Sequence, residues 1–314
     1  MSRRGLGNGA RRFRILPVVV FIVLFLVTGA FAFHFPAAGW HRGDVSVAQE
    51  ESQRALLAAL RSASPNIEFD LIDFKDEKGN RVGLVVHDYD TKRIAGTEGK
   101  FSRFKKLSDL PRNAANPALP PEPIMTVVEA FEMIKQIKAE GITPTVSLDL
   151  KEEGDSGEDF GRWIGAMIQS YGFQDHVFAS SFYKSNVVSL REACPDCLVG
   201  GLVFNGHWAL KHLDHRYTSL DLTGLSKATF FLGFLGKEDF KHDFVLIQDD
   251  IFFQEPQLAD YWRNVRKVKF VGIYVYDKER PYTDAEWALL KKVDWMELDP
   301  PQMRQYLLQR QQGR

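Results

Sequence analysis

The sequence predicts an α/β fold, an irregular (β/α)8 barrel that is preceded by one hydrophobic N-terminal helix. Apolar runs of strand character alternate with segments of helical periodicity along most of the chain, a rhythm typical of a parallel sheet. We count about nine candidate strands, including one hairpin. The 314 residues are enough for one such barrel and additional segments, because these barrels commonly take about 250 residues.

The expected elements begin after a short approach at 35–40, which is led by Pro36 and rich in small residues, and is therefore a poor first strand. In chain order they are helix 52–61, strand 67–74, strand 81–86, helix 126–140, strand 143–150, helix 160–171, strand 176–182, helix 185–193, strand 198–204, strand 244–248, helix 256–266, strand 268–276, helix 283–293 and strand 295–298. The polar stretch 91–123 predicts a long loop above a site. Residues 205–243 show no clear pattern.

The first two long strands should form an antiparallel hairpin, because the turn between them is too short to carry a parallel crossover. Glu68 and Asp70 share a face of their strand, since side chains alternate along it. With the turn centred near Lys78, His87 lies across from about Phe69 and beside both acids. The sequence therefore predicts two carboxylates and one imidazole in one neighbourhood.

The chain carries 40 basic and 41 acidic residues, which are not evenly spread. Residues 1–14 contain five arginines and no acid, which leaves 35 basic against 41 acidic residues, a net charge of −6, for the remainder. Affinity for a nucleic-acid backbone comes from clustered lysines and arginines. The mildly acidic body therefore argues against a nucleic-acid partner.

An apolar segment follows the basic N-terminus. Ile15–Phe33 is 19 residues without a charge, long enough to cross a bilayer core of about 30 Å, so we predict a transmembrane helix at 15–34. The arginines place residues 1–14 in the cytoplasm and the rest on the exported side, which is periplasmic, lumenal or extracellular. A cleaved signal peptide is the alternative, because 18–27 is a plausible h-region and Ala30-Phe31-Ala32 resembles a cleavage site. Both interpretations export the chain.

The two cysteines, Cys194 and Cys197, lie in one Cys-Pro-Asp-Cys motif. A structural zinc site normally takes four protein ligands, and the sequence offers no second cysteine pair or nearby histidine pair. A local disulfide that holds a turn is therefore favoured over a zinc or redox role, and an exported location would permit it.

Residues with catalytic chemistry stand at or near predicted strand ends, where the active site of such a barrel lies. His41, His87 and Asp149 are in this position. Together with Glu68 and Asp70, Asp149 supplies carboxylate oxygens that suit Mg²⁺ or Ca²⁺ rather than zinc or copper. A cation of this kind offsets the charge that develops during attack on phosphorus.

The remaining charges fit the same chemistry. His41 and His87 each titrate near neutrality and are suited to act as base and acid on opposite sides of a phosphorus atom. Arg42 and Lys151 add the fixed positive charge that a phosphate needs. A Ser-His-Asp triad is the competing enzyme interpretation, but the sequence has no Gly-x-Ser-x-Gly elbow and no phosphate-binding Gly-x-x-x-x-Gly-Lys loop. The set favours phosphodiester cleavage.

These residues also form ordered motifs. They are His41-Arg42-Gly43 followed by Glu50, IEFDLIDFKDEKGNRVGLVVHD, Arg93 and Gly99, Ile124-Met125-Thr126, SLDLK, ASSF at 179–182, VGIYVYD and WMELDPP. In this order they resemble the glycerophosphodiester phosphodiesterases, members of a group of irregular TIM barrels that includes phosphatidylinositol phospholipase C and the sphingomyelinase D type phospholipases. The resemblance covers residues 40 to about 303.

The resemblance implies a metal-dependent phosphoric diester hydrolase. Its substrate would be a glycerophosphodiester or a lysophospholipid-like molecule, split into an sn-glycerol 3-phosphate type product and an alcohol. It implies that Glu68, Asp70 and Asp149 bind one divalent cation, Mg²⁺ or Ca²⁺, that His41 and His87 are the acid/base pair, and that Arg42, Glu50 and Lys151 line the phosphate site. Residues 35–303 would form the barrel and 304–314 a polar C-terminal tail.

The sequence departs from the family pattern at three positions. Asp149 stands where glutamate is usual, and the sphingomyelinase D branch shares this Asp-Leu-Lys, which widens the choice of substrate. Glu51 stands where asparagine is common, which predicts an extra acid near the phosphate site. Tyr274 replaces a frequent tryptophan on a late strand.

Two other functions stay open, a phospholipase D or sphingomyelinase D type lipid head-group hydrolase and a catalytically silent, membrane-tethered barrel that binds phosphate esters. Three further groups receive structural interpretations. His207, His212 and His215 are assigned a solvated or capping role, Phe230, Phe231 and Phe234 are assigned to the core or to an apolar lip facing lipid, and Asp249-Asp250 follow a strand where they would contact substrate hydroxyls.

Overall fold

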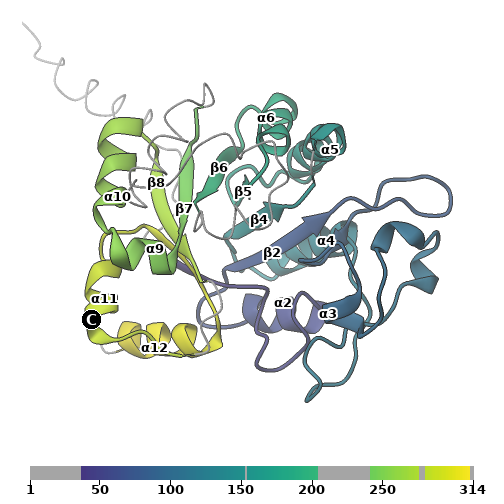
Figure 1. The fold of residues 1–314 in the computed structure, drawn as a ribbon, viewed down its shortest axis with the longest axis horizontal. Helices are drawn as coiled ribbons and strands as arrows, with labels where there is room; N and C mark the ends of the chain where they lie inside the picture. Colours follow the sequence, from purple (N-terminus) through teal and green to yellow (C-terminus); the bar gives the residue numbers. More distant parts are fainter. Residues whose placement is uncertain (1–36, 153, 204–240, 276–279, 312–314) are drawn as a thin grey trace, which may run out of the picture. The chain divides into compact units, whose positions relative to one another are not determined.

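The chain folds as a parallel barrel surrounded by helices (Figure 1), which confirms the predicted α/β barrel. The computed structural model describes residues 37–152, 154–203, 241–275 and 280–311. The predicted transmembrane segment 15–34, the histidines 207, 212 and 215 and the phenylalanines 230, 231 and 234 lie outside the described residues. Within the described ranges, no helix is long and apolar enough to cross a membrane.

The described residues contain nine strands. They are β1 (Ala37–Trp40), β2 (Ile67–Ile72), β3 (Leu84–Val85), β4 (Val146–Leu150), β5 (Val177–Ser181), β6 (Leu198–Val203), β7 (Phe244–Gln248), β8 (Phe270–Tyr274) and β9 (Trp295–Leu298). Eight of them are parallel, and β1 closes the barrel because it pairs with both β9 and β2. The ninth, β3, is antiparallel to β2.

The longer helices cover the outside of the barrel (Figure 1). They are α2 (Gln53–Leu60), α4 (Val127–Ala139), α5 (Gly154–Tyr171), α6 (Lys184–Ala193), α9 (Asp249–Gln254), α10 (Gln257–Tyr261), which continues into a π-helical turn (Trp262–Arg266), α11 (Asp284–Leu290) and α12 (Pro300–Gln311). The predicted loop 91–123 contains the short helix α3 (Lys92–Ala95) and two 3-10 turns, η1 (Phe101–Arg103) and η2 (Leu107–Asp109).

Helix starts follow local sequence signals. Ser52 accepts a hydrogen bond from the Ala55 main-chain N–H and caps α2. Thr126 and Glu129 form a reciprocal capping box at α4, and Thr283 forms another at α11. These caps explain why the predicted starts lie within one residue of the observed ones.

The amino-terminal end of the barrel is filled by aromatic rings. Phe178 makes edge contacts with Phe244, Phe270 and Trp295 at centroid distances of 4.9, 5.3 and 5.1 Å. A Cβ on Gly39 would lie 2.6 Å from the Trp295 ring. The approach was expected to be a poor strand because it is small, and the ring explains the small residue in β1. Polar side chains are left for the opposite end of the barrel.

The β2–β3 hairpin has the predicted register. Leu71 pairs with Val85, and Ile72 pairs with Leu84. The next main-chain bond runs from Val86 N–H to Asp70 O at 3.1 Å. His87 therefore lies across from Phe69 and beside the strand that carries Glu68 and Asp70, as the turn length predicted.

Two further sequence interpretations have clear outcomes. Cys194 and Cys197 form a disulfide where α6 ends and β6 begins, which confirms the local pairing. The segment from 304 is not simply a tail, because α12 continues through it to Gln311 with Met303 and Tyr306 buried. Its sequence is almost evenly polar, so the periodicity that marks a surface helix was absent.

Asp249 follows β7 but does not line the cavity that opens at the carboxyl ends of the strands, so the expected contact with substrate hydroxyls has no support. It starts α9, is fully buried, and accepts a hydrogen bond of 3.0 Å from the Tyr282 hydroxyl. An acid in the first turn of a helix is favoured by the main-chain dipole there. The contacts of Asp249 therefore explain its place after β7 by a structural role at the start of α9.

The aromatic packing gives a stability prediction. Phe178→Ala removes a fully buried ring that touches three others, so the free energy of unfolding should fall by about 3–5 kcal/mol. Urea denaturation followed by tryptophan fluorescence measures it. The matched control is Leu308→Ala, whose side chain is 57% exposed and which should change stability by no more than about 0.5 kcal/mol. Equal stability of the two variants would contradict this packing.

Candidate active site

A cavity of about 700 Å³ opens at the carboxyl ends of the barrel strands. It brings together the eight residues that the resemblance assigned to acid/base catalysis, phosphate binding or metal binding. These are His41, Arg42, Glu50, Glu68, Asp70, His87, Asp149 and Lys151. The serines of the ASSF motif do not line it, because Ser180 and Ser181 donate their hydroxyls to main-chain oxygens of β4.

The loop after β1 turns sharply into the cavity. Arg42 and Gly43 have left-handed φ values of +57° and +80°. A Cβ on Gly43 would lie 2.8 Å from the Ala55 main chain, so only glycine lets the loop pack against α2. The Arg42 main-chain N–H donates to Glu68 Oε2 at 3.0 Å, which ties this loop to β2.

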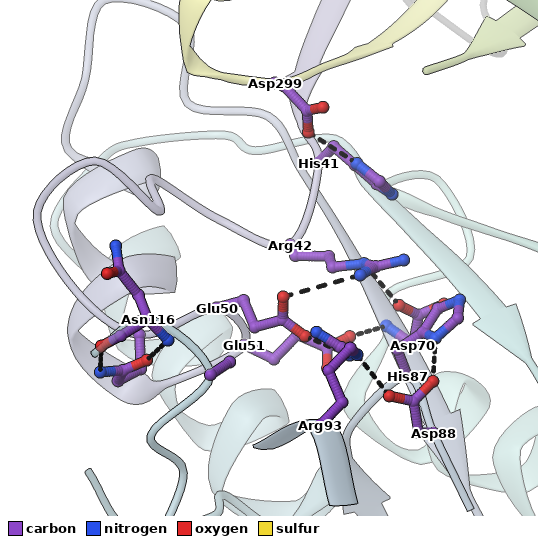
Figure 2. A network of polar contacts seen from close by, with 12 residues as sticks. His41, Arg42, Glu50, Glu51, Asp70, His87, Asp88, Arg93, Asn116 and Asp299 are labelled. Carbon is purple, nitrogen blue, oxygen red and sulfur yellow. Dashed lines mark hydrogen bonds and ion pairs between the residues drawn. The ribbon is translucent and has the colours of Figure 1, made fainter. Parts of the chain in front are cut away.

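His41 is held from two sides. Its Nδ1 lies 2.8 Å from Asp299 Oδ1 (Figure 2), and its Nε2 lies 3.9 Å from Glu68 Oε2. Asp299 directly follows β9, the neighbour of β1. The ring therefore bridges two strands and presents Nε2 to the cavity, where a proton can be exchanged with a ligand.

His87 has a different environment. Its Nδ1 lies 2.6 Å from Asp88 Oδ1, which leaves Nε2 to accept a proton. Burial, followed by the charges of Lys151 and Arg42, lowers the pKa of His87 to about 4. The imidazole is therefore neutral at neutral pH, the form that a general base requires.

Opposite charges alternate across the cavity wall (Figure 2). Lys151 Nζ lies 2.7 Å from Asp70 Oδ1 and also contacts Asp149. Arg42 Nε lies 3.2 Å from Asp70 Oδ2, and its Nη1 lies 3.6 Å from Glu50. Asp70 thus contacts both cationic side chains, Lys151 and Arg42.

The alternation continues to the second histidine. Arg93 Nη2 contacts Glu50 at 2.6 Å, and its Nε contacts Asp88, which holds His87. The spacing of Arg93 was noted in the sequence, but its contacts were not predictable, since Glu50 is far from it along the chain. The network joins the loops after β1, β3 and β4.

The pKa values of the buried carboxylates are shifted in different directions. Burial opposes ionisation of Asp70, but Lys151, His87 and Arg42 outweigh it and lower the pKa of Asp70 well below its usual range. Burial, followed by Asp70 and Glu297, raises the pKa of Glu68 well above its usual range. Burial raises the pKa of Asp149 to about 6. Asp70 is therefore the carboxyl most strongly held in its ionised form, at the point where Lys151 and Arg42 meet.

Two acids on one strand end were missed in the sequence. Glu297 and Asp299 both line the cavity, and the Trp295 indole donates to Glu297 Oε1 at 3.3 Å. These three residues alternate in Trp-Met-Glu-Leu-Asp, which places them on one face of β9. The sequence signal that could have identified them is an acid, Glu297, at an inward-facing position of a strand that is otherwise apolar.

Glu51 does not lie where the sequence predicted. It is 2% exposed, does not line the cavity, and its Oε1 accepts a hydrogen bond of 2.8 Å from the Asp70 main-chain N–H. Burial, followed by Asp70, raises the pKa of Glu51 well above its usual range. Glu51 therefore lies beside the site, behind the cavity wall, as a structural partner of β2.

The carboxylates suit an oxygen-preferring cation in their chemistry. Asp149 Oδ1 is buried and has no hydrogen-bond partner among the described residues, which is an atom that a ligand would satisfy. Within the same described ranges, no three histidine, cysteine, aspartate or glutamate side chains are already arranged to hold a metal ion. Lys151 lies between Asp70 and Asp149 instead. The shared ion predicted from Glu68, Asp70 and Asp149 stays a prediction.

Comparison with solved structures identifies the fold. A glycerophosphodiester phosphodiesterase from Parabacteroides distasonis matches 88% of this chain and 97% of its own, with a TM-score of 0.58 and 19% identity. One from Thermotoga maritima matches 86% and 97%, with a TM-score of 0.54 and 18% identity. This barrel has the glycerophosphodiester phosphodiesterase fold.

A third structure with this fold contains a ligand. The phosphodiesterase from Oleispira antarctica, in complex with the product sn-glycerol-3-phosphate, matches 88% of this chain and 97% of its own, with a TM-score of 0.55 and 18% identity. These neighbours are phosphoric diester hydrolases by name. No protein-family model and no curated protein matches the chain.

The acid on β9 gives a prediction about pH. Burial is the main cause that raises the pKa of Glu297 to about 7 from a usual 4.5. The folded chain then keeps a proton that the unfolded chain releases, so this contribution to stability is present below pH 4.5 and is lost as the pH rises through 7. Glu297→Gln stays neutral, so its stability relative to the wild type should increase between pH 5 and pH 8.5, by about 3 kcal/mol.

Urea denaturation of both proteins in EDTA at the two pH values measures this difference. Glu98→Gln, at a side chain that is 84% exposed, is the matched control and should show no such change. A difference between Glu297→Gln and the wild type that is the same at both pH values would show that the buried acid is not protonated in the folded chain.

Proposed function

We propose that the chain is a metal-dependent phosphodiesterase that hydrolyses glycerophosphodiesters to an sn-glycerol 3-phosphate type product and an alcohol. One observation carries the proposal. A single cavity at the carboxyl ends of the strands is lined by both histidines, by Arg42 and Lys151, and by the buried carboxylates of Glu68, Asp70 and Asp149. The product named for the Oleispira antarctica structure supports this substrate class.

Arg42 and Lys151 would bind the phosphate. Both contact Asp70, which keeps them charged and fixed in place. A guanidinium and an ammonium at fixed positions stabilise charge that develops on phosphate oxygens in the transition state. Glu50 contacts Arg42 and Arg93, and would orient the guanidinium of Arg42.

The two histidines would divide the proton transfers. Neutral His87 would take a proton through Nε2 from the attacking water as the new P–O bond forms. His41 would give a proton to the departing alcohol oxygen as the old P–O bond breaks. Asp299 and Asp88 hold the two rings by Nδ1 and so orient the reacting nitrogens.

Glu68, Asp70 and Asp149 would hold one divalent cation, Mg²⁺ or Ca²⁺. Bound there, such an ion would polarise a phosphoryl oxygen and offset negative charge. The oxygen donors and the unpartnered Asp149 Oδ1 support this assignment. Lys151 would then need to share Asp70 and Asp149 with the ion.

Apolar and aromatic side chains also line the cavity and bear on the substrate. They form an apolar part of its wall, which comprises Val45, Phe182, Leu202, Tyr274, Val275, Pro300 and Pro301. A glycerol phosphate without an apolar group would not cover these apolar side chains, whereas a substrate that carries an apolar group would. The wall therefore supports a lysophospholipid-like substrate as the second candidate, within the same reaction class.

We also propose that the barrel acts on the exported side of a membrane. The uncharged segment Ile15–Phe33 and the five arginines before it support this location, either as an anchor or as a cleaved signal. The Cys194–Cys197 disulfide also supports it, since disulfides persist mainly in oxidising compartments.

The activity itself is the first test. The chain should release choline or glycerol phosphate from glycerophosphocholine or lysophosphatidylcholine when Mg²⁺ or Ca²⁺ is supplied, and EDTA should abolish the release because the carboxylates lose their cation. Both cleavages release choline, so the phosphate-bearing product, glycerol phosphate from glycerophosphocholine or lysophosphatidate from lysophosphatidylcholine, distinguishes the two substrate classes. No metal-dependent release from either substrate would reject the enzymatic proposal in favour of a silent binding barrel.

The histidines are tested separately. His41→Ala and His87→Ala should each lower kcat by about 10²–10⁴-fold, because each removes one proton transfer. His176→Ala is the matched control, since this residue precedes β5 at the opposite end of the barrel and should leave kcat unchanged. Circular dichroism checks that each variant folds. Full activity of either site variant would remove that histidine from its role.

A further inference from the structure

The loop after β1 and strand β2 are joined by two hydrogen bonds that run in opposite directions. The Arg42 main-chain N–H donates to the Glu68 side chain at 3.0 Å, from loop to strand. The Asp70 main-chain N–H donates to Glu51 Oε1 at 2.8 Å, from strand to loop. The loop is closed on itself by Glu51 N–H, which donates to Arg42 O at 2.9 Å.

The bond from Asp70 fills a gap in the sheet. On this side of β2, β1 pairs only at Ile67, and β3 pairs only at Leu71 and Ile72. Asp70 O accepts from Val86, but its N–H meets no neighbouring strand. A buried main-chain N–H without an acceptor is strongly disfavoured, and the Glu51 carboxyl supplies the acceptor that the sheet lacks.

The main chain at Glu51 has a conformation that is unfavourable for a glutamate. Its φ is +56°, in the left-handed region that favours glycine and asparagine. For a glutamate, this main-chain conformation is energetically unfavourable in the absence of other contacts. Strain of this kind persists where the surrounding structure fixes it, and it often occurs beside functional sites.

We propose that Glu51 is a positioning residue that fixes the main chain of Asp70, and through it the carboxylate to which Lys151 and Arg42 bind. It acts as a hydrogen-bond acceptor, not as a charge, and it touches no substrate. The proposal rests on the proposed function, because the cations positioned in this way are those that would bind the phosphate.

Two variants separate the hydrogen bond from the backbone strain. Glu51→Gln keeps an acceptor oxygen at the same reach but carries no charge. Glu51→Gly relieves the left-handed backbone but removes the acceptor. Lys267→Gly is the matched control, because Lys267 has a φ of +58°, is exposed, and lies after the π-helical turn away from the site.

Hydrogen–deuterium exchange of the β2 amides in the full-length chain is the direct readout. Glu51→Gln should keep Asp70 protected and kcat within about threefold of the wild type. Glu51→Gly should expose the Asp70 amide to exchange, and kcat should fall by about 10–100-fold with little change in KM, the size of effect usual for residues that orient reacting groups. Lys267→Gly should change neither. If Glu51→Gly does not fold, Glu51→Met removes the acceptor at similar length and should give the same result.

Two results would overturn the proposal. One is wild-type exchange at Asp70 together with wild-type kcat when the acceptor is removed. The other is an equal loss in Glu51→Gln and Glu51→Gly, which would assign the effect to charge. The exchange measurement decides the hydrogen bond even if the wild type shows no phosphodiesterase activity, a result that would reject only the proposed function.

Discussion

The site depends on the need to neutralise carboxylates that are buried at one end of the barrel. Charges taken out of water are costly unless opposite charges meet them, and here one acid receives two cations. Asp70 contacts Lys151 and Arg42, so it stays ionised while Glu68 and Asp149 have raised pKa values. The same contacts that stabilise this burial hold in a fixed position the two side chains that we propose bind the phosphate. A chain of alternating charges, from Arg42 through Glu50 and Arg93 to Asp88, then connects the loop after β1 to the aspartate that holds His87.

The barrel makes this arrangement possible by separating its two ends. Aromatic rings of Phe178, Phe244, Phe270 and Trp295 exclude water at the amino-terminal end, so polar groups on the same strands gather at the carboxyl end. The hairpin brings His87 beside β2, and β9 supplies Asp299 to hold His41. Each group comes from a different strand end or loop, as is usual for enzymes built on this architecture.

The sequence was sufficient for the barrel and for a set of candidate residues that the structure brings into one cavity, because strand periodicity and the spacing of His41, Glu68, Asp70, His87 and Asp149 are local properties. It was not sufficient for the partners that hold them. The pairing of His41 with Asp299 joins residues that are far apart along the chain, and the bond from Asp70 to Glu51 depends on where neighbouring strands end. Strand β1 looked like a poor strand from its sequence, because its small residues make room for the Trp295 ring. Helix α12 showed no helical periodicity in its sequence, because its surface is polar almost all round.

A crystal structure of the chain with Ca²⁺ and sn-glycerol 3-phosphate tests the central claim most directly, because it locates the phosphate relative to both imidazoles. The account predicts that the phosphate contacts Arg42 and Lys151, with His41 and His87 on opposite sides of phosphorus and the ion on Glu68, Asp70 and Asp149. A phosphate bound outside this cavity, or one with both histidines turned away from phosphorus, would contradict it.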